Sequence, residues 1–111
     1  MGGVVGGTGT GTVAFGEGMT RPVLISGPGG TMFPQYTREA REAGSEGLMI
    51  VKCTITIEGS VTNCQIIKPV PLMEAAVLSW LAAAKYHPVT FQGRPQQVSY
   101  VFNYRFKLDQ Q

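Results

Sequence analysis

The fold is decided by the stretch Glu46-Gly-Leu-Met-Ile-Val-Lys-Cys-Thr-Ile-Thr-Ile-Glu-Gly-Ser-Val-Thr-Asn-Cys-Gln-Ile-Ile67. Both arms of this stretch are rich in β-branched residues, and apolar side chains alternate with polar ones. The apolar positions of the first arm are Val51, Cys53, Ile55 and Ile57. A period of two predicts half-buried strands. Glu58-Gly59 lies between the arms and predicts a two-residue hairpin turn, because glycine readily adopts the positive φ that such a turn needs.

The predicted turn also fixes which residues of the two arms face each other. It places Cys53 opposite Cys64 and Val51 opposite Ile66, with both pairs on the apolar face, so the turn and the pattern agree. Opposed strand cysteines have the Cβ separation that a disulfide needs. In this register, however, the two cysteines form a hydrogen-bonded pair, which is the less favourable geometry for bridging. A Cys53–Cys64 disulfide in an oxidising compartment is the preferred interpretation, and a pair of buried thiols is the alternative.

Length and composition indicate one domain with a modest core. The chain has 111 residues, 43% of them hydrophobic, and a formal net charge of +2. The nine basic residues are scattered, so the basic stripe with interleaved aromatics that favours nucleic-acid binding is missing. The sequence has neither an apolar run long enough to span a membrane nor the pattern of a signal peptide. Because Met1 directly precedes a glycine tract, we expect the chain to be a fragment whose anchor or export signal lies upstream.

Composition divides the chain into four parts. Residues 1–18 are predicted to be a flexible glycine-rich linker. Residues 19–32 form an extended segment, in which Thr20–Ser26 is either an extra edge strand or a loose piece. Residues 33–108 form the folded domain, and residues 109–111 form a tail.

Two helices and a long strand are predicted within the folded domain. A short helix covers Thr37–Ala43, with Thr37 as its N-cap and Gly44 as its left-handed stop. Apolar residues at three-to-four spacing predict a second helix over Leu72–Lys85. The last strand, about Gln97 to Leu108, alternates aromatic or aliphatic residues with polar ones.

The predicted order is α-β-β-α-β, which gives an α+β fold in two layers. We expect a three-stranded antiparallel sheet with both helices packed on one face. A helical crossover places the last strand beside the first strand of the hairpin and leaves the last strand at the edge. Its middle part, Ser99–Asn103, carries no charge, whereas exposed edges are normally protected. The unprotected edge is therefore predicted to bind an extended peptide.

The residues that could support catalysis do not form a site. His87 is the only histidine, and no cluster of Cys, Asp or Glu with metal-ligand spacing surrounds it. Glu39, Glu42 and Glu46 fit a solvated helix face better than an acid/base pair. Trp80 falls on the apolar stripe of the second helix and is predicted to belong to the core rather than to a ligand platform. We therefore expect a protein that is not an enzyme and has no cofactor.

An ordered set of short motifs resembles the carboxy-terminal domain of TonB. The set covers roughly Phe33 to Leu108. It consists of Pro34-Gln-Tyr36, Glu46-Gly47, Val51-Lys52, Glu58-Gly59, Gln65-Ile66, Tyr86-x-Pro88 and Phe106-Lys107-Leu108. The chain is most similar to the TonB-type domains of myxobacteria, in which the paired cysteines and the Thr90–Pro95 stretch also occur. It differs from the family pattern in having Thr37 after Tyr36, where proline is usual, and Phe33 where a polar residue is common.

The resemblance implies the periplasmic domain of a protein anchored in the inner membrane. Such domains capture the TonB box, an extended segment of a TonB-dependent outer-membrane transporter, beside their last strand. They transmit force from the proton gradient through an ExbB/ExbD motor that engages the amino-terminal part. The implied partner-binding residues are Ser99, Tyr100, Val101, Phe102, Asn103, Tyr104 and Arg105, together with Phe33, Gln35 and Tyr36 ahead of the first helix. Two alternatives stay open: a self-associating domain that forms a homodimer through the same edge, and a TolA-like envelope module acting in secretion or gliding motility.

Overall fold

The computed structural model describes residues 11–108, which form a mixed α and β structure. The elements in chain order are β1 (Val13–Ala14), β2 (Val23–Ser26), a 3-10 turn (Pro28–Gly30), α1 (Arg38–Ala43), β3 (Gly47–Ile55), β4 (Val61–Lys68), α2 (Glu74–Ala83), β5 (Lys85–His87), β6 (Thr90–Phe91), β7 (Arg94–Pro95) and β8 (Val98–Phe106).

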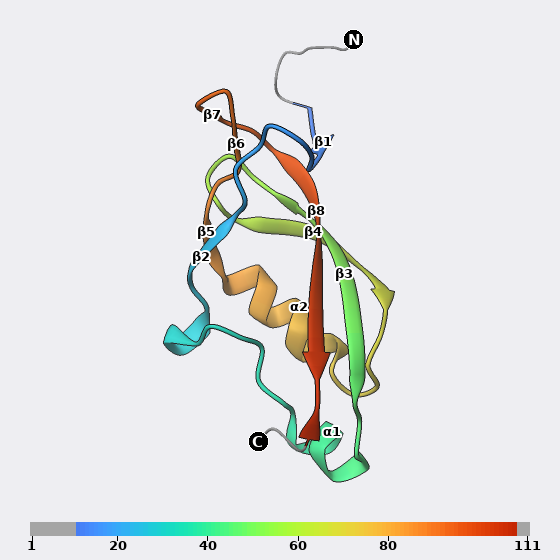
Figure 1. The fold of residues 1–111 in the computed structure, drawn as a ribbon. Coiled ribbons are helices and arrows are strands. Elements are labelled where there is room, and N and C mark those ends of the chain that lie inside the picture. The colour runs from blue at the N-terminus through green and yellow to red at the C-terminus, as the bar shows by residue number, and fades with distance from the viewer. Residues whose placement is uncertain (1–10, 109–111) are drawn as a thin grey trace.

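The main sheet has four strands in the order β1-β8-β3-β4 (Figure 1). Strands β8, β3 and β4 are antiparallel, and β3 is central as predicted. The predicted total of three strands is wrong, because β1 adds to β8 in parallel at Val98 and Ser99. This strand comes from the end of the predicted linker, 1–18; residues 1–10 of that linker lie outside the described part. Strand β1 was missed because it is held by backbone hydrogen bonds, which need no apolar pattern.

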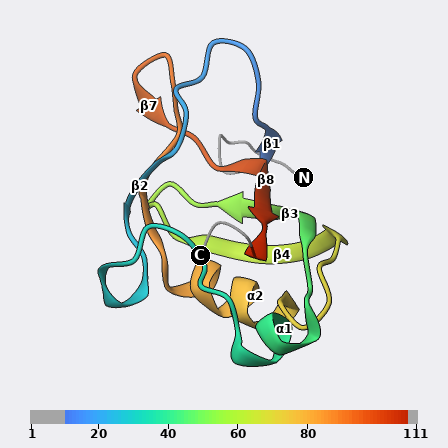
Figure 2. The ribbon, with the colours of Figure 1, turned by 60° about the horizontal axis from the view of Figure 1, so that its bottom comes forward.

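Helix α2 lies across one face of the sheet, and α1 lies at the end where β3 begins (Figure 2). Every second residue of the sheet strands points into the core that lies between the sheet and the helices. Met49, Val51 and Ile55 of β3 are examples, and all three are fully buried. The prediction of α1 is confirmed at both ends. The Thr37 hydroxyl accepts a hydrogen bond from the Ala40 N–H (3.0 Å), and Gly44 is left-handed with φ 72°.

The second helix, Glu74–Ala83, is shorter than the predicted Leu72–Lys85. Leu72 lies outside α2, in a turn where the Met73 N–H donates to the Val70 carbonyl (3.1 Å); it has φ 68° and is half-exposed. The buried side chains of the helix and its two flanks are Met73, Val77, Trp80, Leu81 and Ala84. They recur at three-to-four spacing as predicted, and Trp80 lies on the buried stripe.

The hairpin turn has three residues rather than the predicted two. The Thr56 N–H donates to the Ser60 carbonyl (2.9 Å), which leaves Ile57, Glu58 and Gly59 in the loop and Ile57 exposed. The register between β3 and β4 shifts by one residue between the pairs Lys52–Gln65 and Thr54–Thr62. This bulge, where Asn63 has φ 52°, compensates for the extra residue in the turn. Beyond the bulge Val51 again pairs with Ile66, as predicted.

The change in the turn favours the disulfide. Because Thr56 forms a hydrogen-bonded pair, the alternation along β3 puts Cys53 at a non-hydrogen-bonded position toward β4, where opposed side chains lie closer. Cys53 and Cys64 are bonded, and their Cα atoms are 4.1 Å apart. The preferred interpretation is confirmed, and the predicted obstacle to bridging came from the wrong turn length.

Replacing both cysteines with alanine is expected to lower the free energy of unfolding by about 2–3 kcal/mol. The bridge closes a short loop, with a sequence separation of 11, and a crosslink of this kind restricts the unfolded chain. Urea unfolding of the wild type and of the Cys53→Ala/Cys64→Ala variant measures the difference. Mass spectrometry after alkylation without reduction is the control, because uptake of two alkyl groups by the wild type would reject the bridge.

The remaining strands form two small ribbons beside the main sheet. Strand β2 pairs with β5, and β6 pairs with β7 around the positive-φ residues Gln92 and Gly93. Thr20–Ser26 is thus the edge of a separate ribbon and not of the main sheet. The β2–β5 ribbon is tied to the hairpin, because the Tyr86 N–H donates to the Gly59 carbonyl (3.0 Å). A search of residues 11–108 finds no helix that is both long and apolar enough to cross a membrane.

Candidate functional site

The clearest candidate site is the outer edge of β8. Its side chains alternate as predicted, with Val98, Phe102, Tyr104 and Phe106 buried and Val101, Asn103 and Arg105 exposed. Strand β3 covers one side of β8 along its whole length, from Val98 to Phe106. On the other side, the two-residue strand β1 is the only strand of residues 11–108 that pairs with β8.

The contacts of β1 show which backbone groups of β8 face outward. The Val13 N–H donates to the Gln97 carbonyl (3.2 Å), and the Phe15 N–H donates to the Ser99 carbonyl (3.0 Å). Backbone groups of successive strand residues point to opposite edges, so the odd-numbered residues of β8 present theirs to the side of β1. Beyond Ser99, the N–H and C=O groups of Val101, Asn103 and Arg105 face outward, and no strand among residues 11–108 pairs with them.

This geometry separates the predicted edge residues into three groups. Ser99 already accepts a hydrogen bond from β1. Tyr100, Phe102 and Tyr104 direct their backbone groups to β3. Val101, Asn103 and Arg105 alone combine an exposed side chain with an outward backbone edge. The predicted docking strand therefore narrows to these three residues and their immediate neighbours.

The opposite edge of the sheet is protected, in contrast to β8. Strand β4 is interrupted by the bulge at Asn63, ends in Lys68 and is followed by Pro69. Bulges, lysine and proline are the usual means of preventing a further strand from adding to a sheet. Only the β8 side of the sheet offers a regular, unprotected row of donors and acceptors.

The segment ahead of α1 lies next to the carboxyl end of β8. The Phe33 ring packs edge-on against Tyr104 (5.4 Å between ring centroids), and the Tyr36 ring packs against Phe106 (5.6 Å). Gln35 holds the segment by donating to the Phe33 carbonyl (2.8 Å). The structure thus brings together the two groups of predicted partner-binding residues, which lie about 65 positions apart in the sequence.

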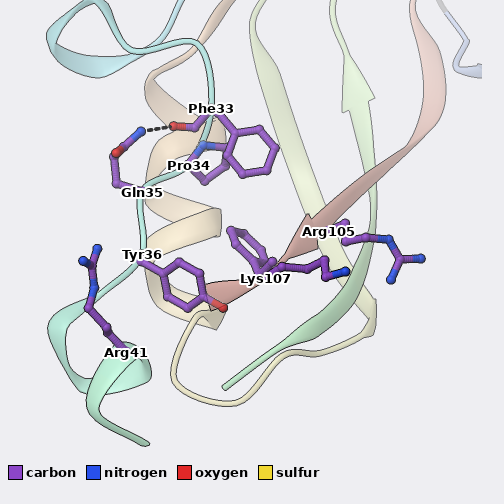
Figure 3. A pocket seen from close by; sticks show the side chains of 8 residues that line it. Phe33, Pro34, Gln35, Tyr36, Arg41, Arg105 and Lys107 are labelled. Carbon is purple, nitrogen blue, oxygen red and sulfur yellow. Dashed lines mark hydrogen bonds between the residues drawn. The ribbon is translucent and has the colours of Figure 1, made fainter. Parts of the chain in front are cut away.

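An open hollow of about 370 Å³ lies between this segment and the strand end (Figure 3). Its cationic lining residues are Arg41, Arg105 and Lys107; Figure 3 shows the guanidinium of Arg41 near Tyr36 and that of Arg105 directed away from it. The Arg41 guanidinium lies 5.9 Å from the centre of the Tyr36 ring. The Glu46 carboxylate fixes the strand end by accepting a hydrogen bond from the Leu108 N–H (2.9 Å).

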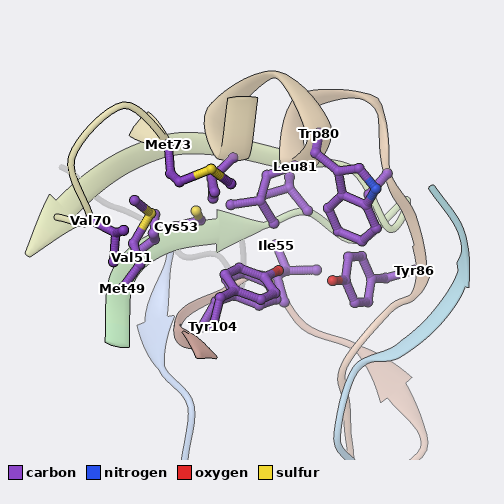
Figure 4. Packing of buried hydrophobic residues seen from close by; sticks show 14 of the residues in the cluster. Met49, Val51, Cys53, Ile55, Val70, Met73, Trp80, Leu81, Tyr86 and Tyr104 are labelled. Atoms are coloured by element: carbon purple, nitrogen blue, oxygen red, sulfur yellow. The ribbon is translucent and has the colours of Figure 1, made fainter. Parts of the chain in front are cut away.

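The inward face of β8 is apolar. Tyr104 is 8% exposed, and its hydroxyl faces the Tyr86 side chain (Figure 4). Burial, followed by the nearby Tyr86, raises the pKa of Tyr104 far above its usual range, so this phenol stays neutral. The buried aromatic rings attach β8 to the core, and the exposed side chains of the strand face solvent.

The structure also places the residues that were considered for other chemistry. Trp80 is 6% exposed and donates from Nε1 to the Thr31 hydroxyl (2.8 Å), which confirms a core role. His87 is exposed in β5. Within residues 11–108, no three His, Cys, Asp or Glu side chains are grouped so that they could hold a metal ion.

Sequence reasoning missed the contribution of β1 to this site. The Phe15 ring packs edge-on against Tyr100 (5.0 Å), and a second hollow of about 360 Å³ lies where β1 ends. Its lining residues are Ala14, Phe15, Lys52, Ser99, Tyr100 and Val101. The only signal in the sequence was the short run Thr12–Phe15 within the glycine tract.

Comparison with known proteins gives the family and the fold of the chain. A family model described as the C-terminal domain of the Gram-negative bacterial TonB protein matches residues 32–108. The chain belongs to this family. The solution NMR structure of the TonB C-terminal domain of Pseudomonas aeruginosa is similar to this TonB C-terminal domain, with a TM-score of 0.53 and 23% sequence identity. The match covers 82% of this chain and 89% of that chain, and it shows a shared fold. A search of curated proteins finds no match.

Membership settles the broad class of this TonB C-terminal domain. The family consists of periplasmic interaction domains of energy transducers and not of enzymes. Membership also implies interaction with TonB-dependent transporters of the outer membrane.

Proposed function

We propose that this domain captures the TonB box of an outer-membrane transporter by strand addition along the outer edge of β8. The observation that carries the proposal is the row of outward N–H and C=O groups at Val101, Asn103 and Arg105, which no strand of residues 11–108 pairs. An extended peptide satisfies such groups with main-chain hydrogen bonds. Phe33, Gln35 and Tyr36, beside the carboxyl end of the same edge, form a second contact surface for the transporter.

The docked strand then serves as a mechanical connection. Force generated by an ExbB/ExbD motor at the inner membrane reaches the domain through its amino-terminal side and passes to the transporter through the β8 edge. The nine paired positions between β8 and β3 support this role, because they tie the docking strand to the centre of the sheet.

Titration with synthetic TonB-box peptides, taken from transporters of the same organism, tests the proposal. In amide NMR spectra of the labelled domain, we expect the largest shifts at Val101, Asn103 and Arg105, whose N–H groups would gain partners. Chemical-shift changes centred on β4 would contradict the proposal. So would a saturating peptide concentration that changes no amide chemical shift of β8.

Self-association through the same edge is the second candidate, because an unprotected edge also accepts a second copy of itself. Sedimentation over a range of protein concentrations distinguishes the two. A monomer that binds the peptide supports capture, whereas a tight dimer that excludes the peptide supports self-pairing. A TolA-like role in secretion or motility would instead appear as a non-transporter partner in a pull-down from outer-membrane extract.

A further inference from the structure

Strand β1 occupies the first part of the edge that β8 presents. It pairs with Val98 and Ser99, and the side chain of Gln97 adds a hydrogen bond to the Thr12 hydroxyl. The chain then leaves the edge at Gly16, directly after Phe15. A visiting strand can therefore pair with β8 only from about Val101 onward, because β1 blocks the edge before that residue.

The hollow at the end of β1 lies on the solvent-facing side of the sheet. Ala14 is paired with Ser99, and Lys52 is paired with Val101, so these four side chains share one face. Phe15 and Tyr100 also line the hollow, but their rings pack against each other on the opposite face of the sheet, beside the core. Most of the walls are apolar, and the single charged residue, Lys52, can contribute its aliphatic stem while its ammonium group stays in water.

A strand docked beside Val101 directs alternate side chains to this same face. The occupant is an extended segment, since the neighbouring stretch of the same edge already holds one, β1. Val101 itself is 47% exposed and apolar, so a side chain that covers it removes apolar surface from water. Because β1 blocks the edge before Val101, it determines which residue of the visiting strand reaches the hollow.

We infer that the hollow formed by β1, Lys52 and Val101 is a side-chain subsite, which selects an aliphatic residue at one fixed position of the docked strand. This inference rests on the proposed function and adds side-chain selectivity to a contact otherwise made by main-chain atoms. It also assigns a role in recognition to Ala14 and Phe15, which lie outside the residues matched by the family model.

A peptide series tests the subsite with the whole 111-residue chain. The probes are synthetic TonB-box peptides that differ at one position at a time, with glycine, leucine or glutamate there. We expect one position at which leucine binds about tenfold more tightly than glycine, as burial of roughly half a leucine side chain predicts. Glutamate at that position should bind no better than glycine, because the walls are mainly apolar.

Two leucine substitutions show whether the hollow is responsible. Ala14→Leu fills the hollow and should reduce the ratio of leucine-peptide to glycine-peptide affinity to about one. Gln65→Leu is the matched control: Gln65 is exposed and pairs with Lys52 on the side away from β8, outside the hollow, so the ratio should stay at about ten.

The outcomes separate this inference from the proposed function. Peptides that bind at the β8 edge with equal affinity for leucine and glycine at every position would overturn the subsite and leave strand capture intact. A preference that survives Ala14→Leu would also overturn it. If no peptide binds at the edge, both the capture and the subsite are rejected.

Discussion

Proline at Val101 or Asn103 is expected to weaken binding of a TonB-box peptide about 100-fold while the domain stays folded. Each of these residues has its N–H on the outer edge, so proline removes a donor that only the visiting strand would use. The proline ring also obstructs the approach of that strand. The loss of one hydrogen bond together with this obstruction accounts for an effect of about 2–3 kcal/mol. Isothermal titration calorimetry with the peptide measures the change, and circular dichroism reports the fold.

Phe102→Pro is the matched control within the same strand. The N–H of Phe102 faces β3, and its ring is 7% exposed, so proline there breaks the central ladder and the core. We expect this variant to lose cooperative unfolding, since proline inside a central ladder is not tolerated. Asn103→Ala, which keeps the N–H, should change affinity less than about threefold. Undiminished binding by the Val101→Pro and Asn103→Pro variants would show that the peptide docks elsewhere.

Gly59→Ala is expected to lower the free energy of unfolding by about 3 kcal/mol, one of the largest effects for a single methyl group in this chain. Gly59 has φ 86°, which is strained for any residue with a side chain. In addition, a Cβ at this position would overlap the carbonyl oxygen of Tyr86, which is backbone and cannot rotate away. The hairpin would have to separate from β5, and the hydrogen bond from the Tyr86 N–H would be lost. Chemical denaturation with a linear extrapolation measures the loss.

Gly93→Ala separates the strain of a positive φ from the overlap with the Tyr86 carbonyl. Gly93 has φ 80°, nearly the same as Gly59, but a Cβ there meets no atom within 4 Å. We expect it to cost only about 1 kcal/mol, the strain of the positive φ alone. Equal losses in the two variants would mean that the contact between the hairpin and β5 contributes nothing to stability.

The sequence predicted the elements that have their own apolar pattern. The alternation from Val98 to Phe106 predicted β8 and its buried face, and Thr37 and Gly44 predicted both ends of α1. The hairpin shows how a correct register can follow from a wrong turn. A third loop residue and the bulge at Asn63 compensate each other, so the pairing of Val51 with Ile66 survives.

The parts that were not predicted depend on partners distant in sequence. Strand β1 is two residues of a glycine-rich segment, and its position is set by the open edge of β8 rather than by its own side chains. Strand β5 follows Ala84 because β2 and the Gly59 carbonyl supply its hydrogen-bond partners. The candidate site was predicted as a strand edge, but its extent could not be, since β1 determines where the free edge begins.

The Cys53–Cys64 bond has a consequence for a domain under load. In the proposed function a pull would act on a strand docked to β8, and the two ladders of β3 would keep the rest of the sheet together. The β8–β3 ladder has nine paired positions, whereas the β3–β4 ladder has five and is broken by a bulge, so the second is the weaker ladder. The covalent crosslink reinforces that weaker ladder. We therefore expect the proposed contact between the visiting strand and β8 to break before the domain unfolds.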